Sequence, residues 1–263
     1  MMRKIAVSLF VALATVTPAF SAIPSSLTDA QLTEEFKGYS GAFEIKDLSD
    51  GTTFRYNDKL LKEKYWPLST FKIPNALIAL DSGVLKVNDS TMKWDGFKNE
   101  LETWNKDQDM QSAMTNSVVW YYQRVAEKIG KERMQKYLHT LKYGNEDSSS
   151  DLTTFWLGPE GSLQTTADQQ VDFLTGLFED KLPVSKQSMS DVRKLIQLKT
   201  EGDNTLFGKT GTMRGNVFGW FVGSVKHANK TYVFATNIRA KDNASGRKAR
   251  KITESILAKM GLL

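Results

Sequence analysis

Ser69 and Lys72 are the residues of this chain whose types and spacing are best suited to catalysis. They stand three positions apart in the run Ser-Thr-Phe-Lys, so a helix would bring the hydroxyl and the amine to one face. A serine hydroxyl is a poor nucleophile until a neighbouring base takes its proton. The pair therefore predicts nucleophilic catalysis with Lys72 as the base, although Ser-x-x-Lys standing alone is more often an ordinary helix start.

Lys72 can act as a base only if its charged form is disfavoured. With an ordinary pKa of ~10.4, about one lysine in 2,500 is neutral at pH 7. Burial can bring a lysine pKa to about 7.5, which would leave roughly a quarter of the amine neutral. The chain supplies apolar residues beside Lys72 and in later motifs that favour such burial: Phe71, Ile73, Val119, Trp156 and Leu157.

The catalytic pair belongs to the first of five short motifs. Ser-x-x-Lys followed by Lys-Thr-Gly is typical of serine enzymes that act on penicillins, and class A enzymes carry Ser-Asp-Asn between the two. This chain has no such triplet at a plausible position. The order that it has resembles the class D β-lactamases, the oxacillinases, from about residue 41 to the C-terminus. The motifs are Ser69-Thr70-Phe71-Lys72, Ser117-Val118-Val119, Tyr143-Gly144-Asn145, Phe155-Trp156-Leu157 and Lys209-Thr210-Gly211, with supporting stretches at 71–74, 94–96, 104–109 and 219–223.

The resemblance implies a serine β-lactamase or penicillin-binding-protein-like fold and hydrolysis of the β-lactam amide through an acyl-enzyme on Ser69. It also implies that Lys72 reacts with carbon dioxide to form a carbamate, which would be the base for Ser69 and for the later attack of water. Trp156 would donate its indole N–H to this carbamate, and Val119 would shield it. The alternatives are an unmodified Lys72 in a salt bridge, with Trp156 and Val119 as ordinary core residues. No other cofactor is expected.

The resemblance also puts the substrate against Lys209-Thr210-Gly211-Thr212, which we expect to be an edge strand. Lys209 would supply positive charge and Thr210 a hydroxyl for the substrate carboxylate. Gly211 has no side chain, so the substrate could approach the backbone there. The backbone N–H groups of Ser69 and Thr212 would form the oxyanion hole.

Ser117 and a C-terminal arginine complete the expected site. Ser117 would relay a proton toward the leaving nitrogen, although it could equally be the N-cap of the next helix, and both roles can coexist. Arg250 is the best match for a second partner of the substrate carboxylate, from its position in the last predicted helix, and Arg247 is its rival. Tyr143-Gly144-Asn145 is expected to be a structural turn at the cleft wall.

Three local features depart from the family pattern. Trp66 and Leu68 precede the nucleophile where the family usually has small residues. The stretch 158–161 is longer than usual, and the loop 213–217 is short. These departures leave the substrate range open without affecting the expected reaction.

Strand signals lie at both ends of the chain and helix signals in the middle. This arrangement predicts an α/β fold of the α+β type, in which both termini build one antiparallel sheet flanked by helices and a helical lobe is inserted. The site is expected between the two lobes. Pro74 lacks the N–H of an ordinary helix residue, so we expect a distorted first turn around Ser69. The expected elements are a helix with a capping box at 28–31, a hairpin of 41–46 and 52–56, mainly helices over 70–198 with stops at Gly83 and Gly130 and a capping box at 166–169, strands over 205–213, 218–225 and 232–238, and a basic helix over 246–259.

The first 22 residues have the pattern of a secretory signal peptide. A basic start at Arg3 and Lys4 precedes the apolar stretch 5–16 and a small-residue region that ends near Ala22. A membrane anchor is the alternative, but the run is short for a span. We therefore expect a single catalytic domain over 23–263, secreted to the periplasm and without a membrane span in its mature form.

Composition argues against several other kinds of site. The chain has no cysteine, so zinc sites built on thiolates are excluded, and no metal is expected. No motif puts an orienting carboxylate beside either histidine, His139 or His227, which disfavours a Ser-His-Asp triad and favours surface positions. The net charge is +5, or +3 without Arg3 and Lys4. Its excess is concentrated late in the chain, where a solvated helix face is a better interpretation than nucleic-acid binding. The residues are Arg239, Lys241, Arg247, Lys248, Arg250 and Lys251.

Two other functions share these motifs. A penicillin-sensing receptor domain would be acylated and stay acylated, but such domains normally follow transmembrane helices. A cell-wall DD-peptidase would usually have Ser-x-Asn where this chain has Ser117-Val118-Val119. The rate of deacylation distinguishes all three. The expected partner is a small β-lactam, and the sequence leaves the oligomeric state open.

Overall fold

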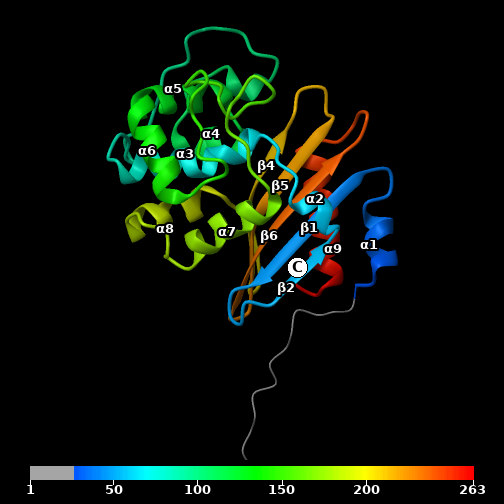
Figure 1. The fold of residues 1–263 in the computed structure, drawn as a ribbon. Coiled ribbons are helices and arrows are strands. Elements are labelled where there is room, and N and C mark those ends of the chain that lie inside the picture. Colours follow the sequence, from blue (N-terminus) through cyan, green and yellow to red (C-terminus); the bar gives the residue numbers. More distant parts are fainter. Residues whose placement is uncertain (1–26) are drawn as a thin grey trace, which may run out of the picture.

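Both ends of the described chain contribute to one antiparallel sheet (Figure 1). The structure, a computed structural model, describes residues 27–263, and the predicted signal segment 1–22 lies outside them. The strands of the sheet follow the order β2-β1-β6-β5-β4-β3, which confirms the predicted antiparallel sheet. Their bounds are β1 Ser40–Asp47, β2 Thr53–Tyr56, β3 Gln197–Glu201, β4 Asn204–Thr212, β5 Phe218–His227 and β6 Lys230–Arg239.

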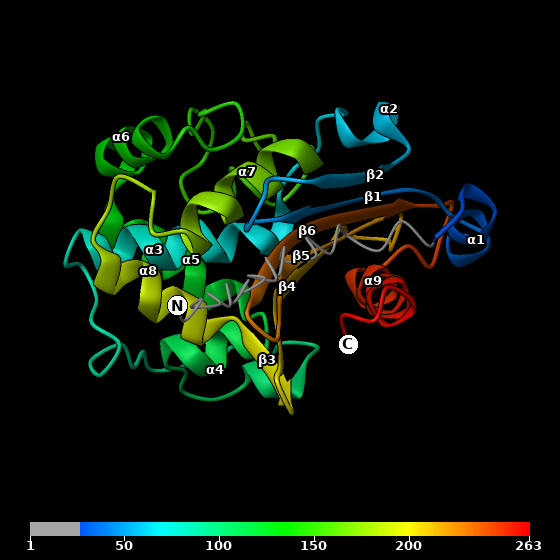
Figure 2. The same cartoon turned by 90° about the horizontal axis from the view of Figure 1, so that it is seen from below.

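Different parts of the chain cover the two faces of this sheet. The helix α9 Gly246–Lys259, with α1 Asp29–Glu35 beside it, lies against one face, and α2 Asp58–Leu61 and α7 Ala167–Phe178 of the inserted segment lie against the other (Figure 2). Side chains alternate between the faces along each strand. On β5, Phe221 therefore joins the core beneath α9, while its neighbours Trp220 and Val222 join the core of the helical lobe.

The segment between β2 and β3 forms the predicted helical lobe. Its central helix, α3, has nearly every side chain buried, including Lys72 and Asn75, and it contains the continuous apolar run 76–80 that such burial favours. The helices of the lobe are α2 Asp58–Leu61, α3 Lys72–Asp81, α4 Met110–Thr115, α5 Val119–Ile129, α6 Lys131–Leu141, α7 Ala167–Phe178 and α8 Lys186–Leu195, with short 3₁₀ turns η1 Leu68–Phe71 and η2 Glu102–Trp104. The α+β prediction with an inserted lobe is confirmed.

Local sequence signals set several boundaries. Thr28 and Thr166 each form the predicted capping box at the start of α1 and α7. The predicted hairpin is the β1–β2 pair. Gly130, at a φ of 81°, ends α5 as expected.

Three stretches of the region predicted to be mainly helical differ from that prediction. Residues 83–109 contain turns, isolated bridges and η2 but no α-helix. Residues 142–166 also consist of turns and irregular segments without a helix. The strand β3 begins where the helical region was expected to end. Most of its side chains are exposed, and its ladder partner is β4. An exposed polar edge strand lacks the alternation of apolar residues that reveals a strand in sequence.

Candidate active site

A strained turn carries Ser69 at the entrance of α3. Leu68, the residue before it, has a φ of 56°, a conformation that costs a non-glycine residue about 1–3 kcal/mol. The backbone N–H of Leu68 donates to the carbonyl of Trp156 at 2.9 Å. Pro74 is the third residue of α3, where a backbone N–H has no acceptor within the helix, so proline is tolerated. The predicted distortion around Ser69 is confirmed.

Lys72, the first residue of α3, points at the nucleophile. Its Nζ lies 2.9 Å from Ser69 Oγ, and the residue is 1% exposed. Burial lowers the pKa of Lys72 well below its usual range, and the charge of Lys209 adds to the effect. Among the described residues no carboxylate pairs with Lys72, so the salt-bridged alternative is wrong. A neutral amine beside Ser69 can accept the hydroxyl proton.

A second lysine–serine pair faces the first. Lys209 Nζ donates to Ser117 Oγ at 2.9 Å and to the carbonyl of Thr210 at 3.1 Å. Burial lowers the pKa of Lys209 to about 7, so its ammonium group can release a proton near neutral pH. The N-cap of α5 is Val118 and not Ser117, so the alternative role of Ser117 as an N-cap is wrong. The Ser117 hydroxyl is engaged by Lys209 instead.

The strand that carries Lys209, β4, is not the edge strand that was expected, because β3 lies outside it, but its second half has one unpaired edge. β5 pairs with β4 as far as Thr212, but β3 pairs with it only as far as Phe207. Beyond that point no strand of the described chain covers the other edge of β4. A Cβ added at Gly211 would lie 3.1 Å from the carbonyl oxygen of Pro67 and 3.4 Å from Ser69 N. The missing side chain thus lets the strand approach the turn that carries Ser69.

A cavity of about 610 Å³ brings six of the predicted site residues together with Arg247, whereas Lys72, Gly211, Trp156 and Arg250 do not line it. It lies between the helical lobe and β4, which confirms the expected position between the lobes. Its wall includes residues that the motifs did not assign to the site, in η2 and at the end of α4. The lining residues are Ser69, Leu101, Glu102, Thr103, Trp104, Thr115, Asn116, Ser117, Val119, Lys209, Thr210, Thr212 and Arg247.

The two candidate arginines occupy different positions. Arg247 lines the cavity that contains Ser69. Arg250 lines a neighbouring cavity of about 260 Å³ that also reaches Lys209 and Thr210. Its Nε donates to Glu254 at 2.8 Å. Of the two, only Arg247 shares a cavity with the nucleophile, and the carboxylate-binding role of Arg250 stays a prediction.

Trp156 presents a buried donor without a partner. It is 1% exposed, its ring centroid lies 5.2 Å from that of Phe71, and its Nε1 has no hydrogen-bond acceptor among the described residues. Leaving a buried donor unpaired costs about 1–3 kcal/mol. The site therefore fits an added group with acceptor oxygens, as the predicted carbamate on Lys72 would have.

Two of the three departures from the family pattern contact each other. The indole of Trp66 donates to the carbonyl of Gly161 at 2.7 Å, so the large residue before the nucleophile holds the long stretch 158–161. Tyr143-Gly144-Asn145 is the expected structural turn. The side chain of Asn145 bonds both Ser162 and Gln164.

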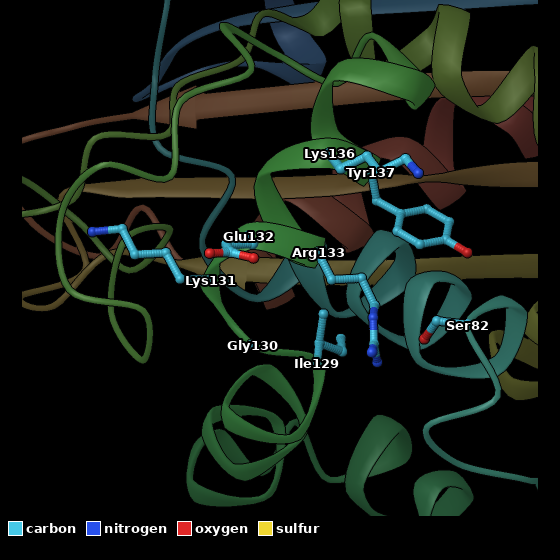
Figure 3. Close-up of a pocket in the computed structure, with 8 residues that line it drawn as sticks. All are labelled: Ser82, Ile129, Gly130, Lys131, Glu132, Arg133, Lys136 and Tyr137. Atoms are coloured by element: carbon cyan, nitrogen blue, oxygen red, sulfur yellow. The ribbon is translucent and has the colours of Figure 1, made fainter.

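Neither a larger cavity nor the two histidines provides another candidate active site. A cavity of about 840 Å³ at the α5–α6 junction is lined by Lys131, Arg133, Lys136 and Tyr137 among others (Figure 3), and it contains no paired nucleophile and base. His139 is exposed beside Glu146, and His227 contacts Asn204, so neither reaches Ser69. Within residues 27–263 no carboxylate and histidine cluster could hold a metal ion, and no helix is long and apolar enough to cross a membrane.

Comparison with known proteins gives consistent matches. Residues 29–258 match the family model of the penicillin-binding protein transpeptidase domain. The chain is 44% identical over 232 residues to the probable β-lactamase YbxI of Bacillus subtilis, covering 88% of this chain and 84% of YbxI. The structure of the class D β-lactamase BAT-2 superposes with a TM-score of 0.84 at 39% identity, covering 90% of this chain and 99% of BAT-2.

A regulatory protein is also similar. The chain is 37% identical over 226 residues to BlaR1 of Bacillus licheniformis, covering 85% of this chain but 37% of BlaR1. The C-terminal domain of that penicillin receptor superposes with a TM-score of 0.84 at 35% identity, covering 90% of this chain and 96% of the domain.

Proposed function

The chain belongs to the class D β-lactamases, and on this premise we propose that it hydrolyses the amide bond of penicillins and related β-lactams through an acyl-enzyme on Ser69. The observation that carries the proposal is the 2.9 Å contact between Lys72 Nζ and Ser69 Oγ. Burial holds this amine in a state that can accept a proton. The hydrolysis of such antibiotics would confer resistance.

Acylation would use both lysine–serine pairs. Ser69 Oγ attacks the β-lactam carbonyl carbon while its proton passes to the Lys72 side chain. The carbon–nitrogen bond of the ring then breaks, and the leaving nitrogen takes a proton from Ser117, which Lys209 replenishes across their 2.9 Å contact. The backbone N–H groups of Ser69 and Thr212 would hold the oxyanion of the tetrahedral intermediate.

Substrate binding would use the cationic rim of the same cavity. Lys209 and Thr210 offer a charge and a hydroxyl to the substrate carboxylate. Arg247, in the Ser69 cavity, and Arg250, in the adjoining one, are the two candidates for a guanidinium partner.

We propose further that Lys72 carries carbon dioxide as a carbamate, with Trp156 Nε1 as its donor and Val119 at its side. The support is the buried lysine with a lowered pKa and the unpaired indole N–H. The group would supply an anionic base for the attack of water on the acyl-enzyme. In degassed, mildly acidic buffer the rate should fall, and bicarbonate at fixed pH should restore it. Lys72→Ala should lose turnover and gain nothing from bicarbonate, whereas a wild-type rate indifferent to bicarbonate would contradict this part of the proposal.

Export would follow from the first 22 residues, which we propose to be removed as a signal peptide. The support is the sequence pattern of 1–22 alone. N-terminal analysis of the protein recovered from the periplasm should begin near Ile23. Retention of Met1 in the recovered protein would contradict it.

A sensor domain is the second candidate, because the similarity to the BlaR penicillin receptor extends over nearly its whole C-terminal domain. A sensor would form the same acyl-enzyme and keep it. Turnover of a chromogenic cephalosporin separates the two functions. We expect many turnovers by the wild-type protein, none by Ser69→Ala, and wild-type behaviour by Ser82→Ala, which removes a hydroxyl just after the same helix. A single stoichiometric burst without turnover would favour the sensor, and turnover by Ser69→Ala would refute both.

A further inference from the structure

A buried chain of hydrogen bonds runs from the third motif to the turn that carries Ser69. The hydroxyl of Tyr143 donates to Gln170 Oε1 at 3.2 Å, and Gln170 Nε2 donates to Thr70 Oγ1 at 2.9 Å. The Thr70 hydroxyl then donates to the carbonyl of Pro67 at 2.6 Å. Tyr143, Gln170 and Thr70 are each 2% exposed or less, so water does not compete for these bonds.

The direction of each bond in this chain is fixed. Thr70 has one hydroxyl proton and gives it to Pro67, so Gln170 must present its amide N–H to the Thr70 oxygen. The carbonyl of Gln170 then faces Tyr143. Burial raises the pKa of the Tyr143 hydroxyl above its usual range, which keeps it a donor. Bonds that all point one way polarise one another, so each strengthens the next.

The chain of hydrogen bonds ends at the turn that carries Ser69, where the position of the nucleophile is set. The carbonyl of Pro67 accepts both the hydroxyl and the backbone N–H of Thr70, and these two bonds close the turn that contains Ser69. The same carbonyl lies against Gly211, on the strand that faces the substrate. Because Leu68 is held in a strained conformation, the turn depends on such contacts to keep its shape.

We propose that Gln170 is a positioning residue for acylation: through Thr70 it holds the Pro67–Ser69 turn so that Ser69 Oγ stays aimed at Lys72 and at the substrate carbonyl. The inference rests on the proposed acylation of Ser69. Gln170 lies in the second turn of α7 and lines no cavity that contains Ser69, so its effect on the reaction is indirect. Its loss should therefore slow acylation without weakening substrate binding.

Rapid-mixing measurements of acylation by a penicillin test this directly. Gln170→Leu and Thr70→Val should lower the acylation rate at saturating substrate by about 10- to 100-fold, as displaced reacting groups do. The substrate concentration for half-saturation should change by less than about twofold, because uniform binding is untouched. Thr70→Ser keeps the hydroxyl and should stay within about threefold of the wild-type rate.

Two controls separate positioning from general destabilisation. Thr175→Val changes the same helix, but its hydroxyl has no hydrogen-bond partner in the described structure, and it should leave the rate unchanged. The double variant Gln170→Leu/Thr70→Val should be no slower than the slower single variant, because both break one shared bond. Thermal unfolding establishes that each variant is folded at the assay temperature.

The outcomes distinguish this inference from the proposed function. If wild-type Ser69 is not acylated, the proposed function fails. If the wild-type protein is acylated and folded Gln170→Leu matches its rate, only the positioning role is refuted. A Thr175→Val loss as large as that of Gln170→Leu, or single effects that multiply in the double variant, would also refute it. If Gln170→Leu does not fold, the comparison of Thr70→Val with Thr70→Ser decides, and equal rates for these two would refute the role.

Discussion

Replacing Trp156 by phenylalanine removes one N–H and keeps most of the aromatic packing. The indole packs on Phe71 and Phe155 with centroid separations of 5.2 and 5.0 Å, and a phenyl ring can retain much of that contact. The N–H itself has no acceptor among the described residues. Trp156→Phe thus tests whether that donor serves a group bound at Lys72.

The two possible states of the site predict effects of opposite sign. If the N–H bonds a carbamate on Lys72, its loss should weaken carbamate formation by about 1.5–3 kcal/mol, the value of a hydrogen bond to a charged group. That range corresponds to about a 10- to 150-fold higher bicarbonate concentration for half-maximal activity. If nothing bonds the N–H, its removal relieves an unpaired buried donor, so the free energy of unfolding should rise or stay level.

The assay is turnover against bicarbonate concentration at one mildly acidic pH, with carbon-13 bicarbonate and NMR to detect the carbamate carbon directly. Trp220→Phe is the matched control, because its indole already donates to the carbonyl of Trp66 at 3.1 Å. That variant should lose about 1 kcal/mol of stability and keep the wild-type bicarbonate dependence. An unchanged bicarbonate dependence in Trp156→Phe would refute the role of the indole.

Three further predictions follow from other charged groups. Burial, with the nearby Asp168 carboxylate, raises the pKa of Glu44 from 4.5 to about 7, although Arg55 at 2.8 Å opposes the shift. The folded state therefore holds a proton that the unfolded state releases, and the protein should lose stability, by a few kcal/mol at most, as pH rises from about 4.5 through 7. Glu44→Gln, which mimics the protonated side chain, should be more stable than wild type at pH 8 but not at pH 5 in urea unfolding, and a difference independent of pH would contradict this. Lys209, with its pKa near 7, should lose its charge as pH rises. The value of kcat/KM for a carboxylate-bearing substrate should therefore fall about tenfold between pH 7 and pH 8.5. A flat profile from pH 6 to 9 would refute the role of Lys209 as the charge that binds this carboxylate. The variants Arg247→Ala and Arg250→Ala separate the two guanidinium candidates. Loss of the arginine that binds the substrate carboxylate should raise KM about tenfold or more, with kcat nearly unchanged. An unchanged KM in both variants would exclude both arginines.

Local patterns were enough to predict the parts of the site that lie within a few residues of each other. The spacing of Ser69 and Lys72 predicted their contact, because residues one turn apart share a helix face. Pro74 predicted the distorted turn, and the capping box at Thr166 set the start of α7. The alternation of strands at both ends gave the sheet and the inserted lobe. Each of these signals depends on neighbouring residues alone.

Contacts between distant segments were not predictable from the same patterns. The η2 wall of the cavity comes from the stretch 83–109, whose sequence has no regular period. The edge strand β3 is polar and mostly exposed, so it resembles a loop. Gln170 reaches Thr70 across 100 residues, and only the packing of α7 brings the two together. The relative positions of Arg247 and Arg250 depend on the rotation of α9, which a helical pattern alone does not fix.

One time course tests the central claim most directly. The wild-type protein is mixed with a penicillin, quenched at intervals from milliseconds to minutes, and weighed intact, with peptide mapping of any adduct. We predict an adduct of one intact penicillin on Ser69 that appears within the first turnover, is held while substrate remains, and disappears with release of the hydrolysed product. Substrate hydrolysis without an adduct, an adduct on a residue other than Ser69, or an adduct that persists after the substrate is gone would contradict the account.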